Sequence, residues 1–333
     1  DALANTVAQL GVEALQTNNP TEAVNQLSEA IALRPDDPIN AANLGLAYLA
    51  LRHIDQATHH LGHAMVLRPD NPAIVTAAAR LYLAQNRPKA VLKSMYALPS
   101  KSWSANMYHM VGVAHLRLRR VGRAVEALRR GIALQPNDAA LQFDLGRALI
   151  RRASFAEADD VLNQLPAEWT RSDDRLVAMT RGYAAYRAKR YESAIRHLST
   201  IRTPSSQITN LTAAAWTHWG IQLTKNRRFK SALIAFETAS SLQKQIASTA
   251  NHAAVRYQLG DTKSAYQVWR KLARRNRNPA LAFNISTYYD DEVGNEAKAY
   301  RWLKKAAQRL TTTMKVDIDR LLLRKKTLFG FSS

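Results

Sequence analysis

The segment His59-His60-Leu61-Gly62-His63 carries the residues whose type and spacing come closest to a metal site. His59 and His63 stand four residues apart, so on a helix they would share one face and could hold one divalent metal ion. A stable site needs a third or fourth ligand, and no acidic residue or further histidine stands at a suitable spacing. We therefore interpret these histidines as solvated residues of an outer helix and predict no metal and no cofactor.

The motifs of the common enzyme classes are absent from the sequence. It has no phosphate-binding loop, no dinucleotide-binding glycine pattern, no Gly-x-Ser-x-Gly elbow and no paired-histidine zinc motif. The acidic residues Asp290-Asp291-Glu292 and the pair Asp317 and Asp319 lack the spaced ligands and the glycine of a calcium loop. There is also no cysteine, which excludes disulfides, thiolate ligands and cysteine nucleophiles. We predict that the chain is not an enzyme.

The net charge of the chain is +21, and it rises from one end to the other. Residues 1–102 hold 8 Lys and Arg against 8 Asp and Glu, for a net charge of 0. Residues 103–203 hold 17 against 10, for +7, and residues 204–333 hold 22 against 8, for +14. Such a gradient creates a positive field towards the C-terminal end, so we expect acidic partners to be favoured there.

Basic runs add a local signal to this gradient. They lie at Arg117–Arg130, Lys225–Lys230 and Arg270–Asn278. One interpretation is a docking stripe for an acidic protein, an anionic polysaccharide, a membrane surface or nucleic acid. The other is the solvated exterior that any large helical protein needs. Both interpretations stay open at this stage.

The elements that must position these residues repeat along the chain. An alanine recurs at intervals of 33 to 38 residues, at Ala23, Ala57, Ala90, Ala124, Ala158, Ala194, Ala232, Ala265 and Ala299. Four positions later stands a large apolar residue, except at Ser94: Leu27, Leu61, Leu128, Leu162, Leu198, Phe236, Trp269 and Leu303. Twelve positions before the alanine, six units carry glycine: Gly11, Gly45, Gly112, Gly146, Gly182 and Gly220. This regularity predicts a repeat protein.

The repeat unit is predicted to be a pair of antiparallel helices. The small and large residues four apart share one helix face, and the glycine falls on the helix before it. Because two helices approach closely only where side chains are small, glycine and alanine mark the contact and the large residue covers it. Asn19-Pro20, Arg87-Pro88 and Gly260-Asp261 fall between the paired helices, where proline can begin a helix and aspartate can cap one. Pro35, Pro69 and Pro136 then end the second helices.

These residues resemble the tetratricopeptide-repeat family. The resemblance is carried by Val7, Leu10, Gly11, Ala14, Ala23, Leu27, Ala30 and Pro35, by Ala41, Leu44, Gly45, Tyr48, Ala57, Leu61, Ala64 and Pro69, and by Trp216, Gly220, Ala232, Phe236 and Ala239. It implies an all-α, right-handed superhelical solenoid of helical hairpins over residues 1–306, followed by a C-terminal capping helix and tail at 307–333. We expect about nine units, near 4–37, 38–71, 72–104, 105–138, 139–172, 175–208, 213–245, 246–278 and 279–306.

Several places depart from the repeat pattern. The third unit has Ala79 where glycine is usual and Ser94 where a large residue belongs, and it lacks one residue near Pro88. The longer intervals predict extended loops near Leu165–Asp174 and Ser199–Asn210, the latter a candidate hinge.

The resemblance also implies that the first helix of each unit lines a concave groove that binds a peptide or a partner protein. The corresponding residues are Asn43, His109, Arg117, Phe143, Asp144, Arg147, Arg151, Tyr183, Tyr186, Arg187, His218, Lys225, Asn251 and Tyr257. Tyrosine, phenylalanine and arginine are the types that carry binding energy at interfaces. The carboxylate clamp of chaperone-binding members does not match, because only Asn43 is kept where Ala8, Val12, Ala73 and Ala77 hold the other places.

The sequence therefore predicts a non-catalytic protein-interaction scaffold that favours acidic partners. The alternative is an electrostatic binder of an anionic polymer such as nucleic acid or acidic polysaccharide. No apolar run approaches the length of about 20 residues that crosses a bilayer, and the first residue is Asp1. We expect a processed product or a fragment, with the adaptor region of a bacterial envelope, secretion or export complex as one possibility. A periplasmic or envelope location is favoured over the cytoplasm, and membrane contact is expected to be peripheral at most.

Overall fold

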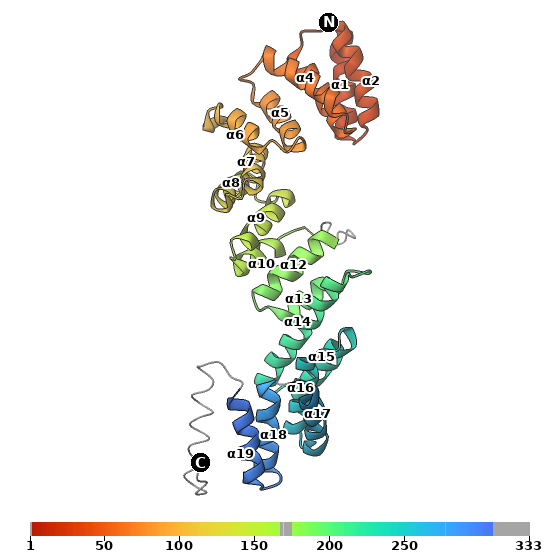
Figure 1. Ribbon diagram of the computed structural model, residues 1–333. Helices are drawn as coiled ribbons and strands as arrows, with labels where there is room; N and C mark the ends of the chain where they lie inside the picture. Colours follow the sequence, from red (N-terminus) through yellow and green to blue (C-terminus); the bar gives the residue numbers. More distant parts are fainter. Residues whose placement is uncertain (1, 167–168, 170–174, 277, 309–333) are drawn as a thin grey trace. The chain divides into compact units, whose positions relative to one another are not determined.

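The computed structural model describes residues 2–166, 169, 175–276 and 278–308. Within these residues every regular element is a helix and there is no strand, which confirms the all-α fold class (Figure 1). The chain divides into two compact units, Asp1–Val177 and Ala178–Ser333. The units are described separately below.

The first unit consists of paired helices, each packed on the next along the chain. Its helices are α1 (Ala2–Gln16), α2 (Pro20–Leu33), α3 (Pro38–Ala50), α4 (Ile54–Leu67), α5 (Pro72–Ala84), α6 (Pro88–Tyr96), η1 (Ser100–Ser102), α7 (Ala105–Arg117), α8 (Val121–Leu134), α9 (Ala139–Arg151) and α10 (Phe155–Asn163). The first helices of successive pairs also touch one another, in the order α1, α3, α5, α7 and α9. These helices form one continuous layer, and it is the layer that carries the predicted groove residues of this unit.

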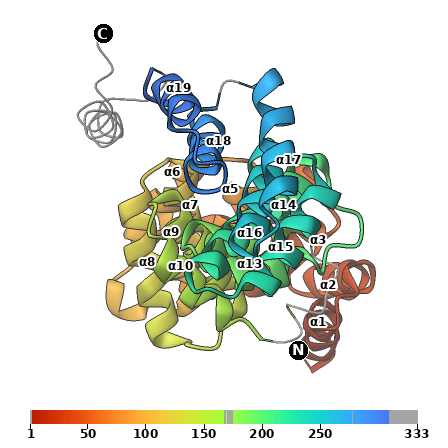
Figure 2. The same cartoon turned by 90° about the horizontal axis from the view of Figure 1, so that it is seen from below.

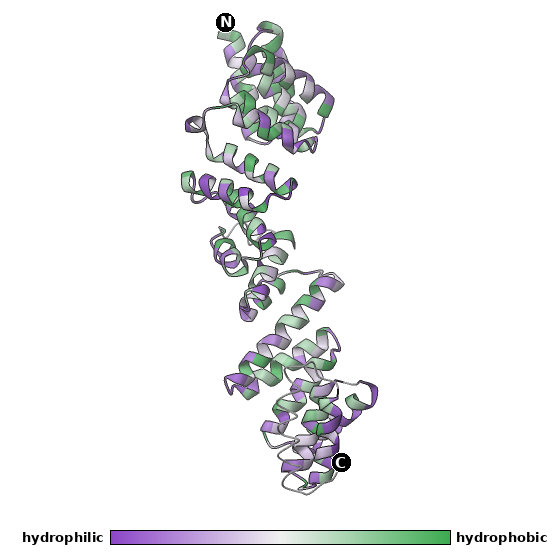
Figure 3. Ribbon diagram, turned by 60° about the vertical axis from the view of Figure 1, so that its left-hand side comes forward, coloured by the Kyte–Doolittle hydropathy of each residue, from purple (hydrophilic) through white to green (hydrophobic). Residues whose placement is uncertain are grey.

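The second unit repeats the arrangement, with α12 beginning just before the boundary. Its helices are α12 (Arg175–Arg187), α13 (Tyr191–Leu198), α14 (Ser206–Lys225), α15 (Phe229–Leu242), α16 (Ile246–Gln258), α17 (Thr262–Arg275), α18 (Pro279–Asp291) and α19 (Glu296–Ala307). The pairs α14 with α15, α16 with α17 and α18 with α19 pack together, and α18 and α19 lie side by side in two views (Figure 1, Figure 2). Apolar and polar residues alternate along the helices, as expected where only one face is buried (Figure 3).

A glycine on the first helix receives the large residue of the second helix in six hairpins. At Gly45 a Cβ atom would lie 2.6 Å from Leu61 Cγ, and at Gly220 it would lie 2.7 Å from the Phe236 ring. The same close approach occurs at Gly11, Gly112, Gly146 and Gly182. Distances under 3.0 Å leave no room for a Cβ, so the large residue fits a notch that only glycine provides. The predicted close approach at the glycine is confirmed, but the prediction that the alanine meets the glycine was wrong, because the large residue occupies that place.

The third unit keeps the repeat in a different register from the predicted one. Ala90 and Ser94 are half-buried, whereas Val91 and Met95 are both fully buried in the core. The prediction that Ala90 and Ser94 hold these two places was therefore wrong. Val91 follows Ala57 by the regular 34 residues, so the missing residue falls after Val91, where α6 ends early.

The turn within each hairpin contains one residue with positive φ. These residues are Asn18, Arg52, Asn86, Arg119, Ala153, Lys189, Arg227, Gly260 and Gly294, with φ between 54° and 92°. The left-handed conformation ends the first helix and lets the next N–H reach back five residues, as His53 N–H does to Tyr48 O at 2.9 Å. The hairpin turn is thus set by backbone geometry even where arginine or lysine occupies the strained position.

Prolines lie at the helix ends as predicted, and Asp261 stands at the N-cap position of α17. Pro20 and Pro88 begin α2 and α6, and α2, α4 and α8 each end two residues before a proline. The predicted loop at Ser199–Asn210 was too long, because α14 already begins at Ser206. Most of the loop predicted at Leu165–Asp174 and nearly all of the predicted capping helix and tail at 307–333 lie outside the described residues.

Candidate functional site

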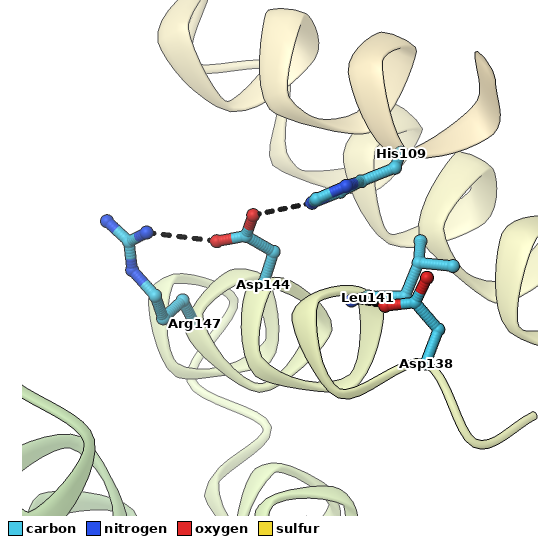
Figure 4. Close-up of polar contacts among 5 residues, drawn as sticks. All are labelled: His109, Asp138, Leu141, Asp144 and Arg147. Atoms are coloured by element: carbon cyan, nitrogen blue, oxygen red, sulfur yellow. Dashed lines mark hydrogen bonds and ion pairs between the residues drawn. The ribbon is translucent and has the colours of Figure 1, made fainter. Parts of the chain in front are cut away.

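His109, Asp144 and Arg147 form a charged cluster on the first helices of two successive hairpins (Figure 4). His109 Nε2 donates to Asp144 Oδ2 at 2.8 Å, and Arg147 Nη1 donates to Oδ1 at 2.9 Å. Asp138 caps the helix that carries Asp144, because its Oδ1 accepts from Leu141 N–H at 3.0 Å. The sequence predicted all three cluster residues as groove residues, and the structure brings them together.

Burial and hydrogen bonding act in opposite directions on Asp144. Burial alone would raise the pKa of this carboxyl group, but the hydrogen bond and charge of His109 and the charge of Arg147 outweigh it. The pKa of Asp144 is therefore lowered from its ordinary value. The carboxylate is ionised at neutral pH and fixes both neighbouring side chains.

Replacing Asp144 with asparagine is expected to destabilise the fold in a pH-dependent way. Because the folded pKa is lowered, the ionised form stabilises the fold above the unfolded pKa of about 3.9. That stability is lost as the pH falls through the folded pKa. Asp144→Asn should lower the free energy of unfolding by about 1–3 kcal/mol at pH 7. This gap between the unfolding free energies of variant and wild type should narrow below pH ~4, because the wild-type carboxylate becomes protonated there. Urea titrations at several pH values measure this gap.

The exposed Asp36 gives a matched control for that experiment. Asp36→Asn makes the same chemical change away from any cluster, so its unfolding free energy should follow that of wild type throughout. An Asp144→Asn gap that stays constant down to pH 2 would contradict the role given to the ionised carboxylate.

Two arginines at the ends of first helices reach back to the preceding hairpin. Arg151 Nη1 donates to Leu116 O at 3.3 Å, and Arg117 Nη1 donates in the same way to Leu83 O. Both carbonyl groups belong to the last turn of a helix, where carbonyls lack partners within the helix. Each contact uses one of the five N–H donors of a guanidinium group, so most donors of Arg117 and Arg151 stay available.

These side chains surround a pocket between α7 and α9. It has a volume of ≈ 630 Å³ and is lined by Val113, Leu116, Arg117, Arg119, Val121, Asp144, Arg147 and Arg151. We call it the arginine pocket. Four arginines and one carboxylate line it, and that carboxylate is already paired with His109 and Arg147. The excess of positive charge suits an anionic group from outside, because guanidinium matches carboxylate geometry with two parallel hydrogen bonds.

Arg119 is the one charged residue of the pocket lining that was not predicted as a site residue. It lies in the hairpin turn with a φ of 57°, outside the helix positions that the family resemblance assigns to the groove. The signal that could have found it is the basic run Arg117–Arg130, which the sequence alone explains equally well as a docking stripe or as a solvated surface.

The other predicted groove residues of the first unit differ in their accessibility. Phe143 is only 8% exposed and packs against Trp169, with ring centroids 5.9 Å apart. Arg147 lies over its other side, 5.7 Å from the ring centroid. Asn43 is half-buried on α3 and is not part of the charged cluster. Phe143 is therefore a core residue whose ring packs against the guanidinium group of Arg147 and helps to hold it in place.

The second unit places its predicted residues in separate small groups. Arg187 Nη1 donates to the Tyr183 hydroxyl at 2.6 Å and lies over that ring. The rings of Tyr186, Tyr191 and His218 cluster, with His218 stacked on Tyr191 at 5.1 Å. Lys225 is exposed at the end of α14, and Asn251 is half-buried on α16. Aromatic and basic groups thus recur on these first helices.

Tyr257 is the last of the predicted groove residues. Its hydroxyl lies 3.5 Å from Asp291 Oδ2. Burial and the neighbouring acidic groups Asp291 and Glu292 raise the pKa of Tyr257 to about 12. The tyrosine is therefore neutral at physiological pH and can donate a hydrogen bond.

The histidines of α4 are separate from the charged cluster. His59 and His63 are both exposed, and the ring of His60 stacks on Tyr48 at 5.5 Å. Burial, together with His59 and His63, lowers the pKa of His60. No group of three potential metal ligands occurs within the described part of the chain. None of the described helices has the length and apolar character needed to cross a bilayer.

Known proteins are similar to this chain in repeat pattern and in fold. The family model described as tetratricopeptide repeat matches residues 9–58 and 110–173. No curated protein sequence matches the chain. The structure is similar to that of PilW, described as a widely conserved type IV pilus biogenesis factor, with 17% identity, a TM-score of 0.54, and coverage of 61% of this chain and 93% of that one.

A second solved structure gives the same result. PilF of Pseudomonas aeruginosa shares 14% identity with a TM-score of 0.54, over 62% of this chain and 95% of that chain. At these identities the likeness is one of fold. The family model shows the tetratricopeptide-repeat sequence pattern over the two matched ranges, and the shared fold agrees with the resemblance.

Proposed function

We propose that this chain is a non-catalytic scaffold whose arginine pocket binds an acidic segment of a partner protein. The observation that carries the proposal is the pocket of ≈ 630 Å³ that is lined by four arginines and a single carboxylate. The repeat fold supports a protein or peptide as the partner, because stacked hairpins offer an extended surface of first helices.

The charges of the pocket favour a carboxylate as the group that enters it. Asp144 holds Arg147 through a 2.9 Å hydrogen bond, so this guanidinium is fixed in place before any partner arrives. Arg117 and Arg151 are anchored through backbone carbonyls. Pre-positioned donors lose little side-chain entropy on binding, so they add more to affinity than flexible surface lysines would.

The first helices of the second unit are proposed to carry a binding surface of their own. Tyr183 and Arg187 are joined by a hydrogen bond, and His218 is exposed beside two tyrosines. Aromatic and arginine side chains of this kind supply apolar area together with directed polar groups. The net charge of +14 over residues 204–333 favours the same acidic partners.

Selection from a random peptide library tests the proposal against the polymer alternative. The full chain is expected to enrich peptides rich in Asp and Glu, and these should keep much of their affinity between 50 and 200 mM salt. An anionic polymer held by six to ten phosphate contacts would lose a factor of about 10³–10⁵ over that range. A selection that does not enrich acidic peptides would contradict the proposal. So would binding to any polyanion, regardless of its sequence, with an affinity that falls steeply as the salt concentration rises.

The adaptor role and the envelope location remain predictions from the sequence. PilW is described as a pilus biogenesis factor, and its likeness to this chain supports a shared fold alone. We propose an envelope location by analogy with such a factor. Fractionation of cells that express the full-length gene checks this location, and recovery in the cytoplasmic fraction would contradict it.

A further inference from the structure

A second pocket lies in the first unit, beside the third hairpin. Its volume is ≈ 640 Å³, and its walls come from the end of α6, the segment after it, and helices α7 and α8. We call it the aromatic pocket; it shares no lining residue with the arginine pocket. It exists because α6 has 9 residues where α4 and α8 have 14, and Pro99 follows the shortened helix.

One wall of the aromatic pocket is a row of three rings. Tyr96 stacks on Trp103 with centroids 5.6 Å apart and planes 20° apart, and Trp103 contacts Tyr108 at 5.0 Å. The indole N–H of Trp103 donates to Leu98 O at 3.3 Å, which fixes the ring. Tyr96 is nevertheless 57% exposed. A fixed aromatic wall that is partly open to solvent offers a face on which another ring can stack.

His115 forms a polar part of the lining. It is only 2% exposed, and its Nε2 lies 3.0 Å from the Tyr96 hydroxyl. Nδ1 is buried and has no hydrogen-bond partner among the described residues. Burial lowers the pKa of His115, and the positive charges of Arg120 and Arg123 lower it further. The nearby Glu126 acts in the opposite direction, but the pKa is lowered on balance, so the imidazole is neutral at physiological pH.

The α8 wall supplies the positive charge of the pocket. Arg130 is paired with Glu126 at 2.8 Å, so these two charges offset each other. Arg123 is exposed and has no ion-pair partner within the part of the chain that the structure describes. One uncompensated guanidinium thus stands at a pocket whose opposite wall is aromatic.

We propose that the aromatic pocket is a second binding site, which takes an aromatic side chain of a partner segment together with an adjacent carboxylate. The ring stacks on Tyr96 and Trp103, and the carboxylate pairs with Arg123. An aliphatic side chain would forgo the stacking, which adds to the gain from burial for aromatic pairs. A basic segment would meet the positive charge of Arg123, which no carboxylate of the pocket offsets because Glu126 is paired with Arg130.

The test uses short capped peptides and the full chain. The probe is Asp-Glu-Phe-Glu-Asp, and the controls are Asp-Glu-Ala-Glu-Asp and Lys-Lys-Phe-Lys-Lys. The readout is the indole N–H resonance of Trp103, identified by its loss in Trp103→Phe. We expect a saturable shift with the probe and at least tenfold weaker binding of both controls. An unshifted resonance, or equal shifts with the alanine peptide, would overturn the proposal.

Matched variants locate the peptide. Arg123→Gln is expected to weaken the probe five- to tenfold, whereas the exposed Lys93→Gln, which removes the same charge outside the pocket, should leave its affinity unchanged. Tyr96→Ala should also weaken the binding of the probe, because the stacking on this ring is lost. An unaltered far-ultraviolet circular dichroism spectrum would show that the variant keeps its helices. Equal affinity of Arg123→Gln and wild type would contradict the proposal. So would loss of the Trp103 shift in a variant altered only in the arginine pocket.

Discussion

Replacing Gly45 with alanine is expected to destabilise the α3–α4 hairpin by about 1–3 kcal/mol. The added Cβ would lie 2.6 Å from Leu61 Cγ and 3.1 Å from the Leu61 backbone nitrogen, so the second helix has to move away. Leu61 is only 1% exposed, which leaves no free space for its side chain to rotate into. Chemical denaturation followed by circular dichroism measures the loss.

Gly62, on the second helix of the same hairpin, gives the control. A Cβ at Gly62 would meet nothing within 4 Å. Because alanine favours a helix over glycine by about 1 kcal/mol, Gly62→Ala should leave stability unchanged or raise it. The same substitution is thus predicted to act differently at two positions of one hairpin, because only Gly45 lies against a buried leucine. Equal effects of the two variants would contradict the hairpin contact described here.

Removing two charges from the arginine pocket is expected to weaken an acidic peptide at least tenfold. The variant is Arg119→Asn with Arg151→Gln, in which asparagine tolerates the left-handed conformation at position 119. Arg147 is left in place, so the pair with Asp144 stays intact. A hydrogen bond to a charged group contributes about 1.5–3 kcal/mol, so losing even one such contact accounts for a tenfold change. Isothermal titration calorimetry with a selected peptide measures the effect.

The control removes two positive charges elsewhere in the first unit. Arg68→Gln with Lys93→Gln changes two exposed residues and lowers the net charge by the same amount. Affinity should then stay within about twofold of wild type at 150 mM salt, where the screening length is about 8 Å. If this control lost as much affinity as the pocket variant, the peptide would be binding to the overall charge of the protein and not to the arginine pocket.

The hairpin architecture could be predicted from the sequence because its contacts leave a fixed spacing. Gly45 and Leu61 are sixteen positions apart, and the same interval separates Gly112 and Leu128. The third unit was misaligned because Ala90 looked like the recurring alanine. Pro88 would have corrected it, since Pro20 precedes Ala23 by three residues as Pro88 precedes Val91.

The candidate site was predictable only in part. His109, Asp144 and Arg147 were expected from their places on the first helices, but the pairing between them depends on how adjacent hairpins stack. Arg119 was missed because it lies in a turn. The rings of Tyr96 and Trp103 are brought together by the early end of α6, which the sequence marks only through Pro99.

Photocrosslinking from inside the arginine pocket tests the central claim most directly. A benzophenone amino acid replaces Val113, which lines the pocket, or Val66 on α4, which is 80% exposed and lies outside it. With a selected acidic peptide, we predict a crosslink from position 113 that an excess of unlabelled peptide suppresses, and none from position 66. Equal crosslinking from both positions, or crosslinking from position 66 alone, would contradict the account.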